Sequence, residues 1–264
     1  MLNILVCVKQ VPDVNLVKID SKTGSLIRQG VPSILNPLDA NALEAAVRTK
    51  EQYGGSVTCI TMGPDMAKEA LKECLAAGAD RAVLLSDRAF ANADTLATSY
   101  VIATAARLLG DFDLIFCGKE SLDGATGQMA SQLAERFDAS LLSCVSQLLT
   151  LDTEKRTVTA YRVLDKGRET AWAKLPCLLT VEKSGFHPRI PNLKSWKLSR
   201  AAEILCYNSD TLAGLDKARI GDPGSPTKVP RTYPPTVGQR GVMIDEGSAE
   251  KNVARLMPLL ADVL

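Results

Sequence analysis

The sequence predicts an α/β protein with a doubly wound parallel sheet, an added antiparallel hairpin and an extended C-terminal arm. Short apolar runs, of which residues 2–8 and 114–117 are the clearest, alternate with segments that have the apolar spacing of helices. Apolar runs of this length are typical of strands buried on both faces of a parallel sheet. Glycine and proline separate the runs at the spacing of βαβ units, which predicts parallel pairing.

In the first half of the chain, the turn residues fit the elements that follow them. After the strand at residues 2–8, Pro12 forces an extended or turned backbone, and residues 14–35 form a long excursion. Asn36 and Pro37 suit the cap and first turn of a helix over residues 40–53. The sequence further predicts strands over residues 56–62, 82–86 and 112–117, and helices over residues 66–77, 95–110 and 129–137.

The pattern changes after Ser140. Residues 158–163 and 169–173 flank a turn at 165–167 and predict an antiparallel hairpin, and residues 175–181 predict another strand. Residues 212–239 are rich in glycine and proline and predict a linker, after which helical spacing returns. We therefore expect a nucleotide-binding domain over residues 1–205. Residues 206–264 are expected to form a linker and an amphipathic helix that docks on this domain or on a partner.

Composition excludes several classes of function. Lysine and arginine total 31 against 30 for aspartate and glutamate, a balance that argues against a nucleic-acid or membrane-surface binder. The seven cysteines include no C-x-x-C pair, and most lie in apolar runs, which predicts buried reduced thiols rather than disulfides or a metal site. No signal-peptide pattern and no membrane-spanning run is evident. We expect a soluble, cytoplasmic protein.

The loop between the strand at 112–117 and the helix at 129–137 is the candidate site. Gly124 and Gly127 allow a tight turn and a close approach to a ligand. Thr126 is the expected N-cap, and the free amides and positive dipole of the helix start attract anions such as phosphate. An ordinary glycine turn between strand and helix is the alternative, because short glycine motifs are weak signals.

The turns at residues 9–13, 62–65, 92–95 and 118–127 all follow strands and carry small, polar or helix-capping residues. In an open parallel sheet such turns gather at the carboxyl edge, where ligands bind. No catalytic or metal-binding motif accompanies them, and the single histidine, His187, lies beside a proline in a basic loop. The sequence therefore predicts a carrier whose cofactor supplies the chemistry.

The chain resembles the β subunit of electron-transfer flavoproteins over nearly its whole length. The matching features are residues 6–13, residues 36–39 with Ala42 and Glu44 beyond them, residues 62–64, 78–81, 118–120 and 126–129, and later Glu169, 175–176 and 188–189. The resemblance implies a Rossmann-like domain of the adenine nucleotide α-hydrolase type, paired with an FAD-carrying α subunit. It implies nucleotide contacts at Cys7, Asn36, Pro37, Leu38, Asp39, Met62, Asp123, Gly124, Ala125, Thr126, Gly127, Gln128 and Met129.

The resemblance favours the electron-bifurcating members of the family, which come from anaerobes and hold a second FAD. Residues 93–98, with Asp94, Thr95 and Thr98, look like this type, and residues 123–125 form a shorter loop than the AMP-binding members have. This type implies NADH as electron donor, ferredoxin or flavodoxin as one acceptor, and a flavin dehydrogenase for acyl-CoA, enoyl-CoA or hydroxy-acid substrates as the other. A plain carrier with structural AMP is the first alternative, and an ATP-binding or AMP-forming enzyme of the related fold is the second.

The resemblance also implies a dehydrogenase-recognition loop over residues 183–200. Leu193 matches its leucine anchor, within a basic segment broken by proline. An exposed leucine surrounded by positive charge suits an acidic partner. Arg189 and Glu169 are the other expected partner-binding residues.

Overall fold

The computed structural model describes residues 1–13, 18–19, 26–27, 31–228 and 241–261. The chain divides into two units, Met1–Pro230 and Arg231–Leu264. The first unit contains the sheet and the five helices that cover it, and the second contains the C-terminal helix.

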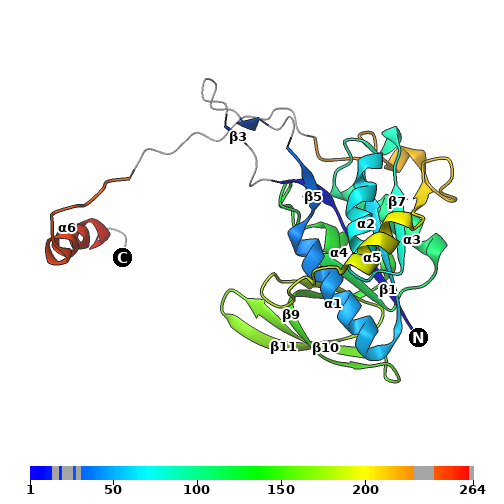
Figure 1. Ribbon diagram of the computed structural model, residues 1–264, viewed down its shortest axis with the longest axis horizontal. Coiled ribbons are helices and arrows are strands. Elements are labelled where there is room, and N and C mark those ends of the chain that lie inside the picture. Colours follow the sequence, from blue (N-terminus) through cyan, green and yellow to red (C-terminus); the bar gives the residue numbers. More distant parts are fainter. Residues whose placement is uncertain (14–17, 20–25, 28–30, 229–240, 262–264) are drawn as a thin grey trace. The chain divides into compact units, whose positions relative to one another are not determined.

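A nine-stranded sheet of order β11-β10-β9-β12-β8-β1-β6-β7-β13 forms the centre of the first unit (Figure 1). Pairing is parallel from β9 to β13 and antiparallel in the β9–β10–β11 ribbon, so the predicted fold class is confirmed. The strands are β1 (Leu2–Cys7), β6 (Gly55–Met62), β7 (Arg81–Leu85), β8 (Leu114–Gly118), β9 (Ser140–Asp152), β10 (Thr157–Leu164), β11 (Gly167–Lys174), β12 (Cys177–Val181) and β13 (Leu205–Tyr207).

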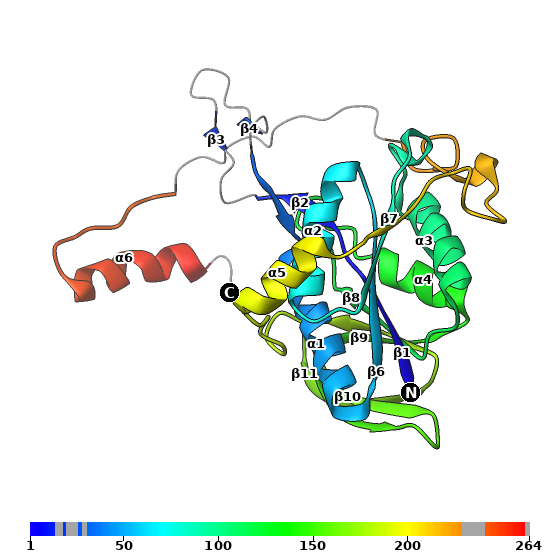
Figure 2. The same ribbon diagram turned by 45° about the vertical axis from the view of Figure 1, so that its right-hand side comes forward.

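Helices cover both faces of the sheet (Figure 2). The helices α1 (Pro37–Tyr53), α2 (Lys68–Ala76) and α5 (Leu193–Ala201) lie on one face, and α3 (Thr95–Leu109) and α4 (Met129–Phe137) lie on the other. Successive strand residues point to opposite faces, so Ile4 and Val6 belong to one apolar core and Leu5 to the other. This arrangement explains why β1 is apolar on consecutive residues.

The order of the strands places a switch point between β1 and β8. The chain passes from β1 to β6 and β7 on one side, and then returns to β8 on the other side of β1. Ligands of open α/β sheets bind in the crevice beyond the carboxyl ends of the strands at such a point. Here those ends are Cys7 and Gly118.

Four short strands occupy the excursion after β1. The pair β2 (Gln10–Pro12) and β5 (Ser33–Leu35) is antiparallel, as is the pair β3 (Lys18–Ile19) and β4 (Leu26–Ile27). Part of the expected excursion, at residues 14–17, 20–25 and 28–30, lies outside the described residues.

Two regions differ from the expectation. Strand β9, which pairs with β10 and β12, was not predicted. The expected linker over residues 212–239 is wrong for its described first part, because Leu212 and Ile220 are buried in the core under α3. β13 pairs with β7, so the first unit continues past residue 205.

The second unit contains α6 (Ala249–Ala261). Its helical spacing was predicted, and the side chains of Val253, Leu256, Met257 and Leu260 are exposed. None of the described helices is both long enough and apolar enough to cross a membrane.

Candidate functional site

Asp39 joins the two strand ends at the switch point. It lies in the first turn of α1, where Asn36 and Pro37 occupy the expected cap and first positions. Its Oδ2 accepts from the amide of Lys9 at 2.8 Å, and its Oδ1 accepts from the amide of Gly118 at 3.1 Å. A Cβ added to Gly118 would lie 2.5 Å from Oδ1, so only glycine leaves room for this carboxylate.

The carboxyl group of Asp39 is buried, and burial raises its pKa to about 7 against the hydrogen bonds that favour its charged form. Both oxygens are held by backbone amides of this chain. Asp39 therefore fixes the geometry of the strand ends, and Leu38 beside it lies partly buried.

Asn36 fastens the loop that follows β8. Its side chain does not cap α1; instead its Nδ2 donates to the carbonyl of Glu120 at 2.9 Å, and its Oδ1 accepts from the amide of Leu122 at 3.3 Å. Its own amide donates to the carbonyl of Lys9 at 2.8 Å. One buried asparagine thus connects the ends of β1 and β8 with the start of α1.

Lys9 holds the same loop through Asp123. Its Nζ lies 2.7 Å from both carboxylate oxygens of Asp123. Although partial burial acts to raise it, hydrogen bonds from Lys9 and Ser121 keep the pKa of Asp123 below its ordinary value. Sequence reasoning did not single out Lys9 as a site residue, although a lysine directly after a central strand is a visible signal.

The loop from Asp123 to Gln128 is exposed, and its last amides have no acceptor among the described residues. The amide of Ala125 donates to the carbonyl of Ser121 at 2.8 Å, whereas within the described part of the chain the amides of residues 126–130 donate to nothing. Gly127 and Ala125 adopt left-handed backbone with φ of 61° and 45°. The expected cap at Thr126 is wrong, because α4 begins at Met129 and Gln128 occupies its cap position.

The start of α3 meets this loop. Thr95 Oγ1 donates to Gln128 Oε1 at 2.9 Å and accepts from Gln132 Nε2 at 3.1 Å, so the first turns of α3 and α4 are joined. Thr98 lies one turn further along α3 and is partly buried.

Asp94 is the N-cap of α3, and it is also tied to a distant segment. Its Oδ1 accepts from the amide of Ala97 at 3.0 Å and its Oδ2 from the amide of Thr227 at 3.0 Å. Its own amide donates to Ser225 Oγ at 2.8 Å. Sequence reasoning missed Ser225 and Thr227, because they lie in a glycine- and proline-rich stretch that reads as a linker.

The remaining expected contacts lie at the same edge. Cys7 ends β1 opposite Cys117 of β8, and Met62 ends β6, partly buried. The turn after β6 is connected through Gln10, whose Nε2 donates to the carbonyl of Met66 at 3.2 Å. The structure thus brings together the four turns that the sequence singled out.

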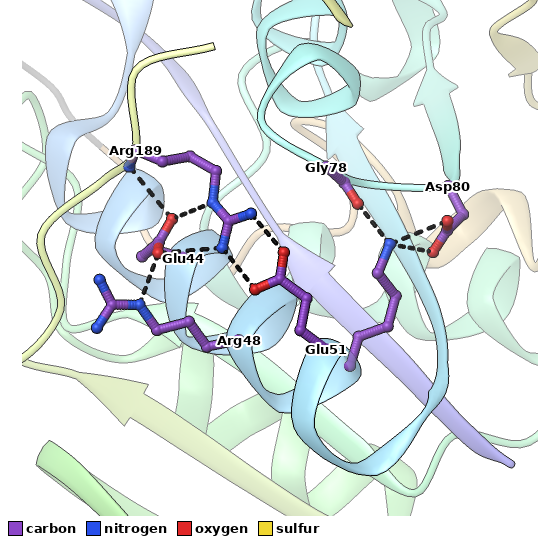
Figure 3. Close-up of polar contacts among 7 residues, drawn as sticks. Glu44, Arg48, Glu51, Gly78, Asp80 and Arg189 are labelled. Atoms are coloured by element: carbon purple, nitrogen blue, oxygen red, sulfur yellow. Dashed lines mark hydrogen bonds and ion pairs between the residues drawn. The ribbon is translucent and has the colours of Figure 1, made fainter. Parts of the chain in front are cut away.

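Arg189 lies away from this edge and is held by α1 (Figure 3). Its Nε donates to Glu44 Oε2 at 2.8 Å and its Nη1 to Glu51 Oε1 at 2.6 Å, while Arg48 donates to Glu44 from the other side. Although burial acts to raise it, these arginines keep the pKa of Glu44 below its ordinary value. Arg189 therefore anchors the loop before α5 to α1.

The other expected partner-binding residues are on the surface. Leu193 begins α5 and is 69% exposed. Glu169 lies in the β10–β11 hairpin, where its Oε1 accepts from Arg162 Nη1 at 2.6 Å.

A doubly wound sheet whose switch-point loops are fastened together at the carboxyl edge defines a Rossmann-like α/β protein. The model of the electron transfer flavoprotein domain family matches residues 23–210 of the chain. The chain belongs to the electron transfer flavoprotein family.

Similar proteins agree with this assignment over almost the full length. An electron transfer flavoprotein subunit beta of Thermoanaerobacterium thermosaccharolyticum is 42% identical over 260 residues, covering 98% of each chain. The CarD subunit of the caffeyl-CoA reductase-Etf complex of Acetobacterium woodii is 43% identical, over 92% of this chain and 92% of its own. FixA of Azotobacter vinelandii is 40% identical, over 95% of this chain and 91% of its own. The resemblance to β subunits is thereby confirmed.

Proposed function

We propose that this chain is the β subunit of a cytoplasmic, electron-bifurcating flavoprotein and that it binds FAD at the switch-point edge. It pairs with an α subunit that carries a further FAD. A flavin bound here would supply the redox chemistry, taking an electron pair from NADH and passing single electrons to the α subunit and to ferredoxin or flavodoxin. The α subunit delivers its electrons to a flavin dehydrogenase for acyl-CoA or hydroxy-acid substrates.

The observation that carries this proposal is the row of free amides at residues 126–130. They lie at the start of α4, where the helix dipole favours negative charge, and their loop is positioned by Lys9 and Asn36. The hydrogen-bond donors that we assign to a diphosphate are therefore backbone amides. No side chain of the site is required as a general acid or base.

FAD needs polar contacts beyond the phosphates, and the start of α3 supplies candidates. The hydroxyl of Thr95 donates to Gln128 Oε1, which leaves the side-chain amide nitrogen of Gln128 without an acceptor among the described residues, and Thr98 follows one turn later. Both carboxylate oxygens of Asp94 are already taken by amides of this chain. We therefore assign Asp94 the role of holding α3 and residues 225–227 in place around the ligand.

The name of one relative supports the proposed work with a partner oxidoreductase. One belongs to a reductase-Etf complex and another is FixA, and both align over more than nine-tenths of this chain. Within the proposed complex, Leu193 would contact the dehydrogenase, and the basic side chains of Lys194 and Lys197 on α5 would attract an acidic surface. α6 would dock on the α subunit.

The test is a count of nucleotides in the purified heterodimer, extracted and identified by chromatography and mass. Two FAD molecules per heterodimer are expected. One FAD with one AMP would refute bifurcation at this site and support the plain carrier.

A matched pair of variants locates the site. Gly127 and Gly167 both have positive φ, and a Cβ on either would meet nothing within 4 Å. Valine strains the backbone at both positions, and more at Gly167, whose φ is 140° against 61° at Gly127, so Gly167→Val is the more severe control. Only Gly127→Val distorts the row of amides. The Gly127→Val complex should keep the α-subunit FAD and lose the second nucleotide, and Gly167→Val should keep both. Retention of both nucleotides by Gly127→Val would contradict the assignment.

A further inference from the structure

A second concentration of positive charge lies one helical turn beyond the candidate nucleotide site. Arg136 follows Gln132 by one turn of α4, and Ser99 follows Thr95 by one turn of α3. Arg136 Nε donates to Ser99 Oγ at 2.9 Å, and its Nη2 donates to the carbonyl of Leu96 at 3.0 Å. The guanidinium group is thereby fixed between the two helices, and Nη1 has no acceptor among the described residues.

Arg219 approaches the same place from residues 216–226. Its guanidinium lies 4.1 Å from the centre of the Tyr100 ring, and that of Arg136 lies 5.4 Å from the same ring. The amide of Asp216 donates to the Tyr100 hydroxyl at 2.9 Å, and the Asp216 side chain caps the short turn Lys217–Arg219. Arg219 is therefore placed by the fold, and a guanidinium stacked on a ring keeps its N–H edge free for an anion.

The two arginines line a pocket of about 360 Å³. Another wall is Pro223 to Pro226, which is fixed because buried Ser225 donates to the carbonyl of Gly221 at 2.6 Å and accepts from the amide of Asp94. Gly221 has φ of 57°, and a Cβ there would lie 2.1 Å from the carbonyl oxygen of Ala89. The wall is thus a defined structure and not a loose strand of chain.

No carboxylate balances this charge within the described residues. Neither Arg136, Arg219 nor the neighbouring Arg107 forms an ion pair there. Partial burial first, and then the charge of Arg219, lowers the pKa of Arg136 from its ordinary value. Like charges gathered in a concave site are unfavourable unless an anion compensates them.

We propose that the pocket between Arg136 and Arg219 binds a phosphate-bearing small molecule, at a site separate from the amides of residues 126–130. The planar N–H edges of two guanidinium groups match the oxygens of a phosphate group. The volume of the pocket suits a small molecule rather than a protein segment. A free diphosphate and the diphosphate of a nucleotide share this chemistry. The inference does not rest on the proposed redox function.

Arg219→Gln is the decisive variant, because Arg219 is exposed and its side chain donates no hydrogen bond within the described residues. Arg136→Gln would also break the contact between α3 and α4. Arg168→Gln in the hairpin turn removes one exposed charge elsewhere and is the matched control. Arg219→Lys keeps the positive charge but removes the planar edge of N–H donors that a guanidinium group offers.

Inorganic pyrophosphate and ADP are titrated calorimetrically into the purified full complex. Both should bind the wild-type and Arg168→Gln complexes, with at least about tenfold weaker binding to Arg219→Gln and an intermediate loss for Arg219→Lys. Pyrophosphate alone binding would identify a free anion as the ligand, and tighter binding of ADP a nucleotide.

The Gly127→Val complex separates this site from the nucleotide site. Binding that survives Gly127→Val and fails in Arg219→Gln supports the proposal even if the second FAD is absent. Binding lost in Gly127→Val but unchanged in Arg219→Gln would overturn it. Absence of binding to the wild-type complex, as expected if an acidic segment of another subunit covers the arginines, would overturn it as well.

Discussion

The amide of Gly118 donates to Oδ1 of Asp39, and that oxygen occupies the space where a side chain at residue 118 would begin. A Cβ there would also lie 2.7 Å from the carbonyl carbon of Leu38 and 2.9 Å from the amide nitrogen of Asp39. Neighbouring backbone cannot move aside as a flexible side chain can. Glycine at this position is therefore a requirement of the switch point.

Gly118→Ala should destabilise the protein, because the added methyl group pushes α1 away from the end of β8. We expect a loss of roughly 2–3 kcal/mol in the free energy of unfolding, measured by urea denaturation. Gly241→Ala, where a Cβ meets nothing within 4 Å, should change it by less than about 0.5 kcal/mol. Equal stability of the two variants would show that α1 and β8 are not in contact through Asp39.

Asp39 should make stability fall as the pH rises. Its pKa is about 7 in the folded protein against an ordinary 3.8, so the folded state binds more protons than the unfolded state between about pH 4 and 7. The contribution of Asp39 is thus most favourable below pH 4 and is lost by about pH 7. Asp94, Asp123 and Glu44, whose pKa values are lowered, have the opposite effect.

Comparison with Asp39→Asn isolates this effect. The wild-type minus variant difference in unfolding free energy, measured at several pH values from 4 to 8, should decrease as the pH rises. The variant cannot titrate, and the other carboxylates cancel in the difference. A difference that rises with pH would mean that the native pKa of Asp39 is lowered.

The contact between Lys9 and Asp123 should tether the loop rather than stabilise the whole fold. Both side chains are partly exposed, so the pair is worth about 1 kcal/mol at most. Lys9→Met and Asp123→Asn should each weaken binding of the proposed nucleotide by up to roughly fivefold, and the double variant no further. The measurement is a double-mutant cycle. The nucleotide affinities of the wild type, the two single variants and the double variant are determined by titration after the bound ligand has been removed. A much larger loss for Asp123→Asn than for Lys9→Met would instead indicate direct contact between Asp123 and the ligand.

Arg189→Met should release the loop that precedes α5. Glu44, whose side chain is 4% exposed, would keep only Arg48 and the backbone amide of residue 189 as partners, and we expect a loss of roughly 2–3 kcal/mol in unfolding free energy. Electron transfer to the proposed dehydrogenase should weaken in Arg189→Met as it does in Leu193→Ala, because Leu193, the proposed anchor, lies just beyond this loop.

Glu51→Gln provides the control for the Arg189 prediction. Glu51 is exposed and is the outer partner of Arg189, so its loss should cost at most about 1 kcal/mol. If Arg189→Met lowers stability but leaves electron transfer to the proposed dehydrogenase unchanged, the anchoring of the loop by Arg189 is separate from recognition of the dehydrogenase.

The helices and parallel strands of the first unit could be predicted because each local signal agreed with the fold. Leu2–Cys7 and Leu114–Gly118 are apolar on consecutive residues because both of their faces are covered. β9 gave no such signal. Its register shifts twice against β10, and Cys144 has φ of 59°, so the alternation that marks a half-exposed strand is interrupted.

The meeting of the candidate-site turns at one edge could be predicted, but not which residues bind ligand and which bind their own chain. Turns that follow parallel strands must meet at one edge, and the sequence showed which turns carry polar residues. Asp39 binds the amide of Gly118 and Asn36 binds the carbonyl of Glu120, which lie 79 and 84 positions away along the chain. Local sequence patterns carry no signal for such distant contacts. The glycine and proline spacing of residues 212–228 concealed that Ser225 and Thr227 bind Asp94.

The attachment of residues 205–228 to α3 and β7 limits where the chain can be cut or fused. A chain that ended at residue 205 would expose the outer hydrogen-bonding edge of β7 and lack Leu212 and Ile220 beneath α3. A reporter or affinity tag inserted there would separate Asp94 from Ser225 and open the wall of the arginine pocket. An insertion in this part of the chain leaves these contacts intact when it follows Lys228.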